Sequence, residues 1–197
     1  MILKPIPKIR PDTTARLFPP IDERTTMFWI QPGSPTLLDV DEIAENMYEA
    51  IPLLYPVDTD YMILSWNRIP IAVNYHTDVY VFVYDIVQLL EDIQTANFAD
   101  AYVSTGSSDF FAQWWIRKEK DELVIDSHWD TVVGNYEFLL NERSRLTVET
   151  AVLTGEWLKL LRRLVDDLTS KSVRMKDEDL FLRTKALLAR PPSGTEA

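Results

Sequence analysis

The 197-residue chain contains no cysteine and only two histidines, His76 and His128. The missing thiols exclude disulfides, cysteine nucleophiles, iron–sulfur clusters and cysteine-based zinc sites. Neither histidine lies in a catalytic motif, and on a strand the neighbours Ser127 and His128 point to opposite faces and cannot pair. We therefore predict no catalytic residue and interpret His128 as a strand-end residue satisfied by solvent or a carboxylate.

Glycine is also scarce, and its five positions, 33, 106, 134, 155 and 194, are too far apart to form a phosphate-binding loop. The clusters Asp58-Thr59-Asp60 and Asp39-Val40-Asp41-Glu42 offer oxygen atoms to a hard cation, but they lack the spacing of a calcium-binding EF-hand. We expect no metal and no cofactor. The alternative is a carboxylate-based or metal-dependent hydrolase that uses Asp58, Asp60 or the region of His128.

Long hydrophobic runs are missing as well. Apolar tracts such as Val79 to Val83 are far shorter than the roughly 20 residues that span a bilayer. The first residues are interrupted by Lys4, Pro5 and Pro7 and lack the apolar core of a secretory signal. We expect a cytoplasmic protein that does not contact membranes.

Basic residues are almost absent from one long segment. Residues 25–116 carry thirteen acidic side chains and one basic side chain, Arg68, a net charge of −12, while the rest of the chain carries nineteen basic and eighteen acidic residues. A field of one sign attracts oppositely charged molecules and repels nucleic acid and anionic membranes. The sequence therefore predicts a basic partner and no nucleic-acid binding.

Aromatic residues within the acidic segment, among them Trp66, Tyr75 and Phe82, distinguish it from a disordered acidic chain. The length and the 46% hydrophobic content suit a single domain. Five prolines in the first 24 residues predict an extended arm. We divide the chain into this proline-rich arm (1–26), a globular domain (27–170) and a polar, helical C-terminal tail (171–197).

Periodicity predicts the α+β class, with one antiparallel sheet of about five or six strands packed with two or three main helices. Pro70 should place its strand near a sheet edge. The run from 78 to 94 has strand propensity, but its apolar residues fit one helical stripe, and we predict a helix capped by Thr77 or Asp78.

Expected strands cover 27–30, 61–66, 69–75, 110–118, 123–129 and part of 136–148. The first expected helix begins after a cap at Asp39 or Asp41 and ends at Pro52. The other expected helices cover 78–94, 157–168 and 177–189. The exposed edge of the 78–94 helix should carry Asp78, Asp85, Glu91 and Asp92.

Trp114 and Trp115 are adjacent on a predicted strand, so one ring should enter the core while the other faces outward. A helix of the same domain is the more common cover for an outward tryptophan, and a partner protein is the alternative. The same question applies to Trp66 and Trp129.

Three segments resemble bacterial immunity proteins of polymorphic and contact-delivered toxin systems. They are WNRIPI (66–71), the hairpin from 111 to 129, and GEWLKLL (155–161), and the similarity extends over residues 27–170. The resemblance implies a small acidic α+β protein that binds a cognate toxin, often a nuclease, and blocks it without doing chemistry. The missing secretory signal would imply that such a toxin acts in the cytoplasm.

We therefore predict a protein that neutralises a basic toxin through acidic and aromatic residues. A structural subunit of a phage or scaffold is a further alternative, which the arm and the helical tail would suit. The predicted partner-binding residues are Asp41, Glu42, Glu45, Glu49, Asp58, Asp60, Trp66, Asp85, Trp114 and Trp115.

Overall fold

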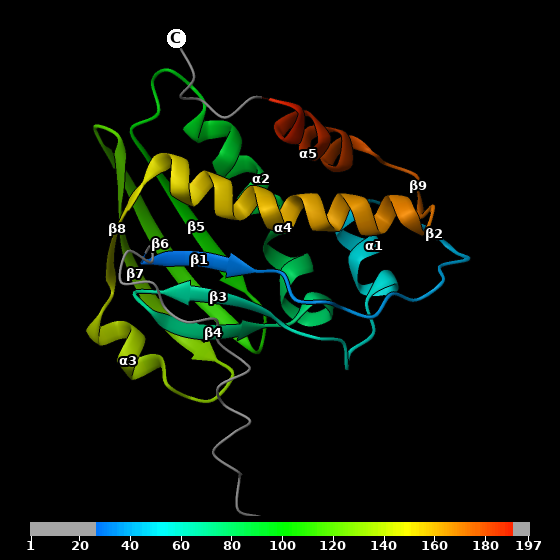
Figure 1. Ribbon diagram of the computed structural model, residues 1–197, viewed down its shortest axis with the longest axis horizontal. Helices are drawn as coiled ribbons and strands as arrows, with labels where there is room; N and C mark the ends of the chain where they lie inside the picture. The colour runs from blue at the N-terminus through cyan, green and yellow to red at the C-terminus, as the bar shows by residue number, and fades with distance from the viewer. Residues whose placement is uncertain (1–26, 191–197) are drawn as a thin grey trace, which may run out of the picture.

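The computed structural model describes residues 27–190, so the predicted arm (1–26) and the last residues of the predicted tail (191–197) lie outside the described residues. The predicted α+β class is confirmed (Figure 1). The strands are β1 (Phe28–Gln31), β2 (Ile43–Ala44), β3 (Met62–Trp66), β4 (Ile69–Val73), β5 (Asp100–Gly106), β6 (Phe110–Glu119), β7 (Glu122–Val132), β8 (Arg145–Glu149) and β9 (Arg174–Met175). The helices are α1 (Met47–Leu54), the π-helical turn η2 (Tyr75–Val79), α2 (Tyr80–Ile93), α3 (Glu137–Glu142), α4 (Thr150–Ser170) and α5 (Asp179–Ala189).

The antiparallel strands are divided between two sheets rather than lying in one. The first has the order β1-β3-β4 and the second the order β5-β6-β7-β8, while β2 and β9 form a short parallel pair. Pro70 lies on β4, an edge strand of the first sheet, as its missing N–H group led us to expect. The second sheet is a meander in which each strand pairs with the next.

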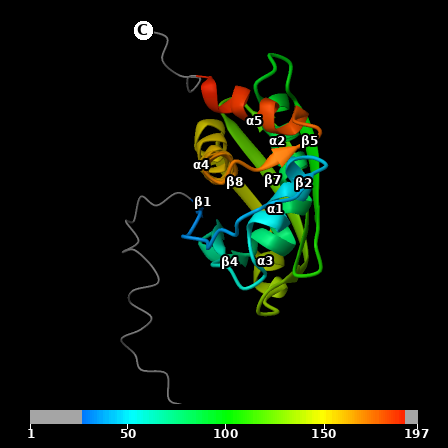
Figure 2. The ribbon, with the colours of Figure 1, turned by 90° about the vertical axis from the view of Figure 1, so that its right-hand side faces the viewer.

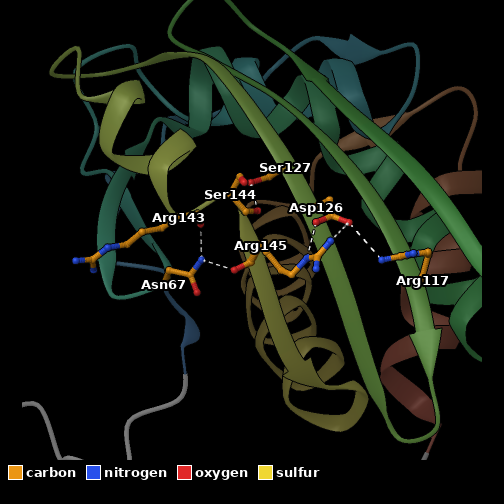
Figure 3. A network of polar contacts seen from close by, with 7 residues as sticks. All are labelled: Asn67, Arg117, Asp126, Ser127, Arg143, Ser144 and Arg145. Atoms are coloured by element: carbon orange, nitrogen blue, oxygen red, sulfur yellow. Dashed lines mark hydrogen bonds and ion pairs between the residues drawn. The ribbon is translucent and has the colours of Figure 1, made fainter.

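The β3–β4 hairpin turns through Asn67 and Arg68, which have φ angles of 49° and 67°. Two positive φ angles in a two-residue connection define the mirror-image turn that matches the twist of antiparallel strands, and asparagine tolerates it well. The Asn67 side-chain amide donates hydrogen bonds to the carbonyl oxygens of Arg143 (2.6 Å) and Arg145 (2.9 Å). The turn of the first sheet is thereby attached to β8 of the second (Figure 3).

Two substitutions at Asn67 separate its backbone and side-chain roles. We expect Asn67→Gly, which keeps the turn but loses the two hydrogen bonds, to lower the free energy of unfolding by about 1 kcal/mol. Asn67→Ala should cost about 1–2 kcal/mol more because alanine disfavours the left-handed conformation. Urea denaturation of both variants measures the difference, and equal losses would contradict the left-handed backbone conformation at Asn67.

Residues 78–94 are helical, as predicted, with Phe82, Val83, Ile86 and Leu90 among the buried residues of α2. The predicted cap is wrong: the side-chain oxygen of Asn74 accepts hydrogen bonds from the N–H groups of His76 and Thr77 at the start of η2. Asp78, predicted to be exposed, is fully buried. Its carboxylate accepts from the Asn74 N–H (2.7 Å) and the Ser107 hydroxyl (2.6 Å), which fixes the start of this helix to the β5–β6 connection.

Helix α1 begins later than predicted. Its cap is Asn46, whose side-chain oxygen accepts from the Glu49 N–H at 3.0 Å, and neither Asp39 nor Asp41 takes this role. Pro52 lies inside the helix rather than at its end. The shift turns Tyr48 and Glu49 outward, while the buried face of α1 consists of Met47, Ala50, Ile51 and Leu54.

The core between the two sheets is rich in aromatic rings, which we call the aromatic cluster. The rings of Trp66 on β3 and Trp114 on β6 stack at 5.4 Å with an interplanar angle of 18°. Edge and tilted contacts join the other members. The cluster consists of Phe28, Trp66, Phe82, Phe110, Trp114, Trp129 and Trp157. Helix α4 contributes Trp157 and lies beside β1, an edge strand of the first sheet (Figure 1).

The segment after residue 170 packs on the same core. Strand β9 pairs with β2, and α5 contacts α1, α2 and α4. Leu180 and Leu187 of α5 are buried with the core residues. Part of the predicted tail therefore covers the side of the molecule that carries α1 and β2, which faces the viewer in Figure 2.

Candidate partner-binding surface

A groove of about 420 Å³ lies where α1, α2 and the start of α5 meet. Its polar lining is mostly acidic, and two tyrosines make up half of its apolar lining. The lining residues are Asn46, Tyr48, Val81, Tyr84, Asp85, Asp177, Asp179 and Leu180. Predicted acidic residues border it, since Glu45 directly precedes the cap Asn46 and Glu49 follows Tyr48 on α1, and both are exposed.

Tyrosine rings line the groove from two helices. Tyr48 on α1 is 40% exposed and Tyr84 on α2 is 50% exposed, which is high for such large apolar rings. The Tyr48 ring packs on Tyr80 with centroids 5.5 Å apart, so it is held in place from within the protein. Two preformed aromatic faces are thus open to a binding partner.

Asp85 is the predicted site residue that lies inside the groove. It is only partly exposed, and burial raises the pKa of its carboxyl group. Within residues 27–190 no hydrogen bond or ion pair from another side chain reaches this carboxylate. A carboxylate withdrawn from water without a partner is the kind of group that a cation from outside stabilises.

Basic residues of the C-terminal segment neutralise part of the acidic region. Lys171 pairs with Asp39 at 2.6 Å and holds the pKa of that carboxyl group below its ordinary value. Lys176 pairs with Glu45, which raises the pKa of the lysine. These pairs join residues more than 130 positions apart, so the charge of segment 25–116 taken alone does not reveal them. Their signal in the sequence is the group of five basic side chains between residues 171 and 185.

Arg183 on α5 makes a third contact of this kind. Its guanidinium group donates two hydrogen bonds to Glu91, at 2.6 and 3.1 Å, and one to Gln88 at 2.8 Å. It also lies over the Tyr84 ring, 5.4 Å from the ring centre. Glu91 and one side of Tyr84 are therefore already occupied by a cation from the same chain.

Two of the predicted partner-binding tryptophans lie in the core. Trp66 is 0% exposed and Trp114 is 2% exposed, both within the aromatic cluster, so we remove them from the candidate surface. Trp115 is 45% exposed, in keeping with the predicted alternation of the two neighbours. Nearly half of Trp115 is thus left uncovered by residues 27–190, and its ring packs on that of Tyr102 with the centroids 5.6 Å apart.

The outer face of the second sheet presents Trp115 within a row across four strands. The register aligns Tyr102, Trp115, Asp126 and Arg145. Asp126 accepts from Arg145 at 2.7 and 3.2 Å and from Arg117 at 3.4 Å (Figure 3). The hydrogen bond from Arg145 holds the pKa of Asp126 below its ordinary value. Because these charges pair with each other, this face offers an aromatic platform without a strong field.

The candidates for chemistry do not converge in the described part of the chain. His128 is exposed, with Asp130 at 3.2 Å, while Ser127 is buried and donates to the Ser144 carbonyl on the other side of the strand. Asp58 and Asp60 are exposed in the loop between α1 and β3. Among residues 27–190 no three acidic or histidine side chains lie close enough together to hold a metal ion.

A second hollow, of about 510 Å³, lies among the ends of α2, α4 and α5 and the β6–β7 turn. Its charged lining has both signs, since it includes the basic Lys118 and Arg190 and the acidic Asp121. Arg190 already donates a hydrogen bond to Gln94. This hollow lacks both the single sign of charge and the exposed tyrosines of the α1–α2–α5 groove.

Comparison of the chain with protein-family models, curated proteins and solved structures found no match. Among the helices within 27–190, none combines the length and the hydropathy that a bilayer crossing requires.

Proposed function

We propose that the protein is a stoichiometric inhibitor that binds a basic bacterial toxin, most simply a nuclease, and blocks its active site without doing chemistry, as immunity proteins do. The observation that carries this proposal is the acidic, tyrosine-lined groove between α1, α2 and α5. The surrounding exposed carboxylates of Asp41, Glu42 and Glu49 extend the same sign of charge. Acidic rim residues speed association with a basic protein, and exposed aromatic rings hold it once bound.

The proposed partner follows from the chemistry of its active site. A nuclease must attract phosphates, so its cleft is lined with lysine and arginine. An acidic protein surface competes with the nucleic acid for such a cleft. The lysine and arginine side chains that attract phosphates also attract its carboxylates. The proposal places both proteins in the cytoplasm, where a nuclease finds its substrate.

The direct test is capture of the basic partner from cells of the source organism on the tagged full-length chain, followed by an activity assay. The expected result is a basic protein retained one-to-one at low salt and released at high salt, whose nuclease activity falls to zero at an equimolar amount of this chain. Full nuclease activity in the presence of excess chain would overturn the proposal, as would retention of acidic proteins only.

Charge reversal on the rim tests the electrostatic part of the proposal. We expect Glu42→Lys combined with Glu49→Lys to slow association with the captured toxin about tenfold at low salt and to have little effect in high salt, because the rim charges act at long range through water. Stopped-flow or surface-plasmon kinetics at two salt concentrations measure this. Glu45 is unsuitable for this test because it pairs with Lys176.

The matched control is Glu122→Lys combined with Glu142→Lys. Both glutamates are exposed, one at the start of β7 and the other at the end of α3, which lies away from α1 and α5 in Figure 1. The control changes the net charge by the same amount. Equal slowing by the two double variants would show that net charge, and not this surface, governs association.

A further inference from the structure

The α1–α2–α5 groove has the features of a site for one cationic side chain. Its volume of about 420 Å³ lies near the lower end of the range for pockets that bind small ligands. Tyr48 and Tyr84 supply aromatic faces, and the negative quadrupole of such a face attracts a cation. Asp85, Asp177 and Asp179 supply carboxylates along the same lining.

The neighbouring contact of Arg183 shows which chemistry this surface accepts. Its guanidinium group combines a face-on contact with Tyr84, hydrogen bonds to Glu91, and an ion pair with Asp179 at 3.6 Å. The groove likewise offers both a ring and a carboxylate, since Tyr48 and Asp85 are among its lining residues. The Arg183 site is filled from within the chain, whereas no side chain from residues 27–190 is bonded to Asp85.

We propose that the groove receives one arginine side chain of the protein partner, with its guanidinium group against Tyr48 and Tyr84 and paired with Asp85. The proposal rests on the proposed function and names the contact that anchors the toxin. Arginine fits better than lysine because its planar group stacks on an aromatic ring and donates several hydrogen bonds at once. The charge complementarity between the acidic lining and a basic partner identifies the occupant.

The test uses the full-length chain labelled with ¹⁵N and two small probes. One probe is N-acetyl-arginine methylamide, and the other is the same derivative of citrulline, which has nearly the same shape but no charge. We expect saturable chemical-shift changes centred on the amides of Asn46, Tyr84 and Asp85 with the arginine probe, and at least fivefold weaker binding of citrulline. Equal binding of the two probes would overturn the proposal, as would shift changes spread evenly over the acidic surface.

Variants connect the probe to the residues. Asp85→Asn and Tyr48→Ala should each weaken binding of the arginine probe at least fivefold. Tyr48 is preferred over Tyr84 because the latter also contacts Arg183. The matched controls are Asp100→Asn and Tyr61→Ala, which change an exposed carboxylate and an exposed tyrosine outside the groove and should bind the probe like the parent chain. Unchanged binding by both groove variants would refute the assignment.

The outcomes separate this proposal from the proposed function. If Asp85→Asn neutralises the captured toxin with the affinity of the parent chain, the groove is not the anchor although the inhibitor function stands. If the arginine probe binds in the groove but no toxin is inhibited, the function falls and the cation site remains. Self-association that Asp85→Asn abolishes, measured by sedimentation, would assign the groove to a second copy of the chain and overturn the proposed occupant.

Discussion

Replacing Trp114 with alanine is expected to lower the free energy of unfolding by about 3–5 kcal/mol, the range for removal of a fully buried aromatic side chain. The same substitution at the adjacent Trp115 should cost less than about 1 kcal/mol, since its side chain is 45% exposed and packs on Tyr102 of the neighbouring strand. Equilibrium denaturation in urea measures both values. The signal should be far-ultraviolet circular dichroism, because each variant removes a fluorescent residue.

The size of the Trp114 effect follows from its position between the two sheets. The ring is 2% exposed and contacts Trp66, Trp129 and Trp157 at centroid distances of 5.4, 6.0 and 6.1 Å. Its removal would leave a cavity bounded by three rigid rings, which cannot collapse to fill it. Equal losses for Trp114→Ala and Trp115→Ala would contradict the packing of the two sheets around this ring.

A third substitution separates packing from hydrogen bonding. The indole N–H of Trp114 is buried without a partner among the described residues. Burial of an unpaired donor costs about 1–3 kcal/mol, so Trp114→Phe removes that cost together with part of the ring. We expect Trp114→Phe to lose far less stability than Trp114→Ala. A loss equal to that of alanine would mean that the indole N–H is in fact satisfied.

Local patterns in the sequence were sufficient for most individual elements. The β3–β4 hairpin was predictable because Asn67-Arg68 joins two apolar runs, and α2 was predictable because its apolar stripe outweighs its strand propensity. The division of strands between two sheets was not predictable in this way. Strand β1 pairs with β3, although α1 separates them in the sequence. This pairing depends on tertiary packing rather than on a local pattern.

The candidate surface was predictable only where exposure follows from local pattern. Alternation along a strand required that one of Trp114 and Trp115 face outward. The polar side chains of Gln113 and Arg117 lie on the same face of the strand as Trp115, and they indicate that Trp115 is the outward residue. The groove depends on α5 packing beside α1 and α2, which no local pattern indicates. The basic residues between 171 and 185 are visible in the sequence, but the carboxylates that Lys171 and Lys176 neutralise depend on the same tertiary packing.

Replacing Asp167 with alanine is expected to lower the free energy of unfolding by about 3 kcal/mol. Asp167 lies on the buried face of α4, 8% exposed, and accepts hydrogen bonds from the Tyr55 hydroxyl at 2.8 Å and the Arg163 guanidinium at 2.5 Å. Burial and the charge of Asp167 raise the pKa of Tyr55 well above its ordinary value, so the hydroxyl remains a donor. Without the carboxylate, a buried hydroxyl and a partly buried cation both lose their acceptor.

The neighbouring Asp166 is the matched control, because it is exposed on the same helix and Asp166→Ala should change stability by less than about 0.5 kcal/mol. A double-mutant cycle with Tyr55→Phe then isolates the hydrogen bond. Since phenylalanine removes the hydroxyl that Asp167→Ala would leave unpaired, the double variant should be more stable than the sum of the two losses implies, by about 1 kcal/mol or more. Strictly additive losses would show that Asp167 stabilises the helix through Arg163 alone and that Tyr55 does not depend on it.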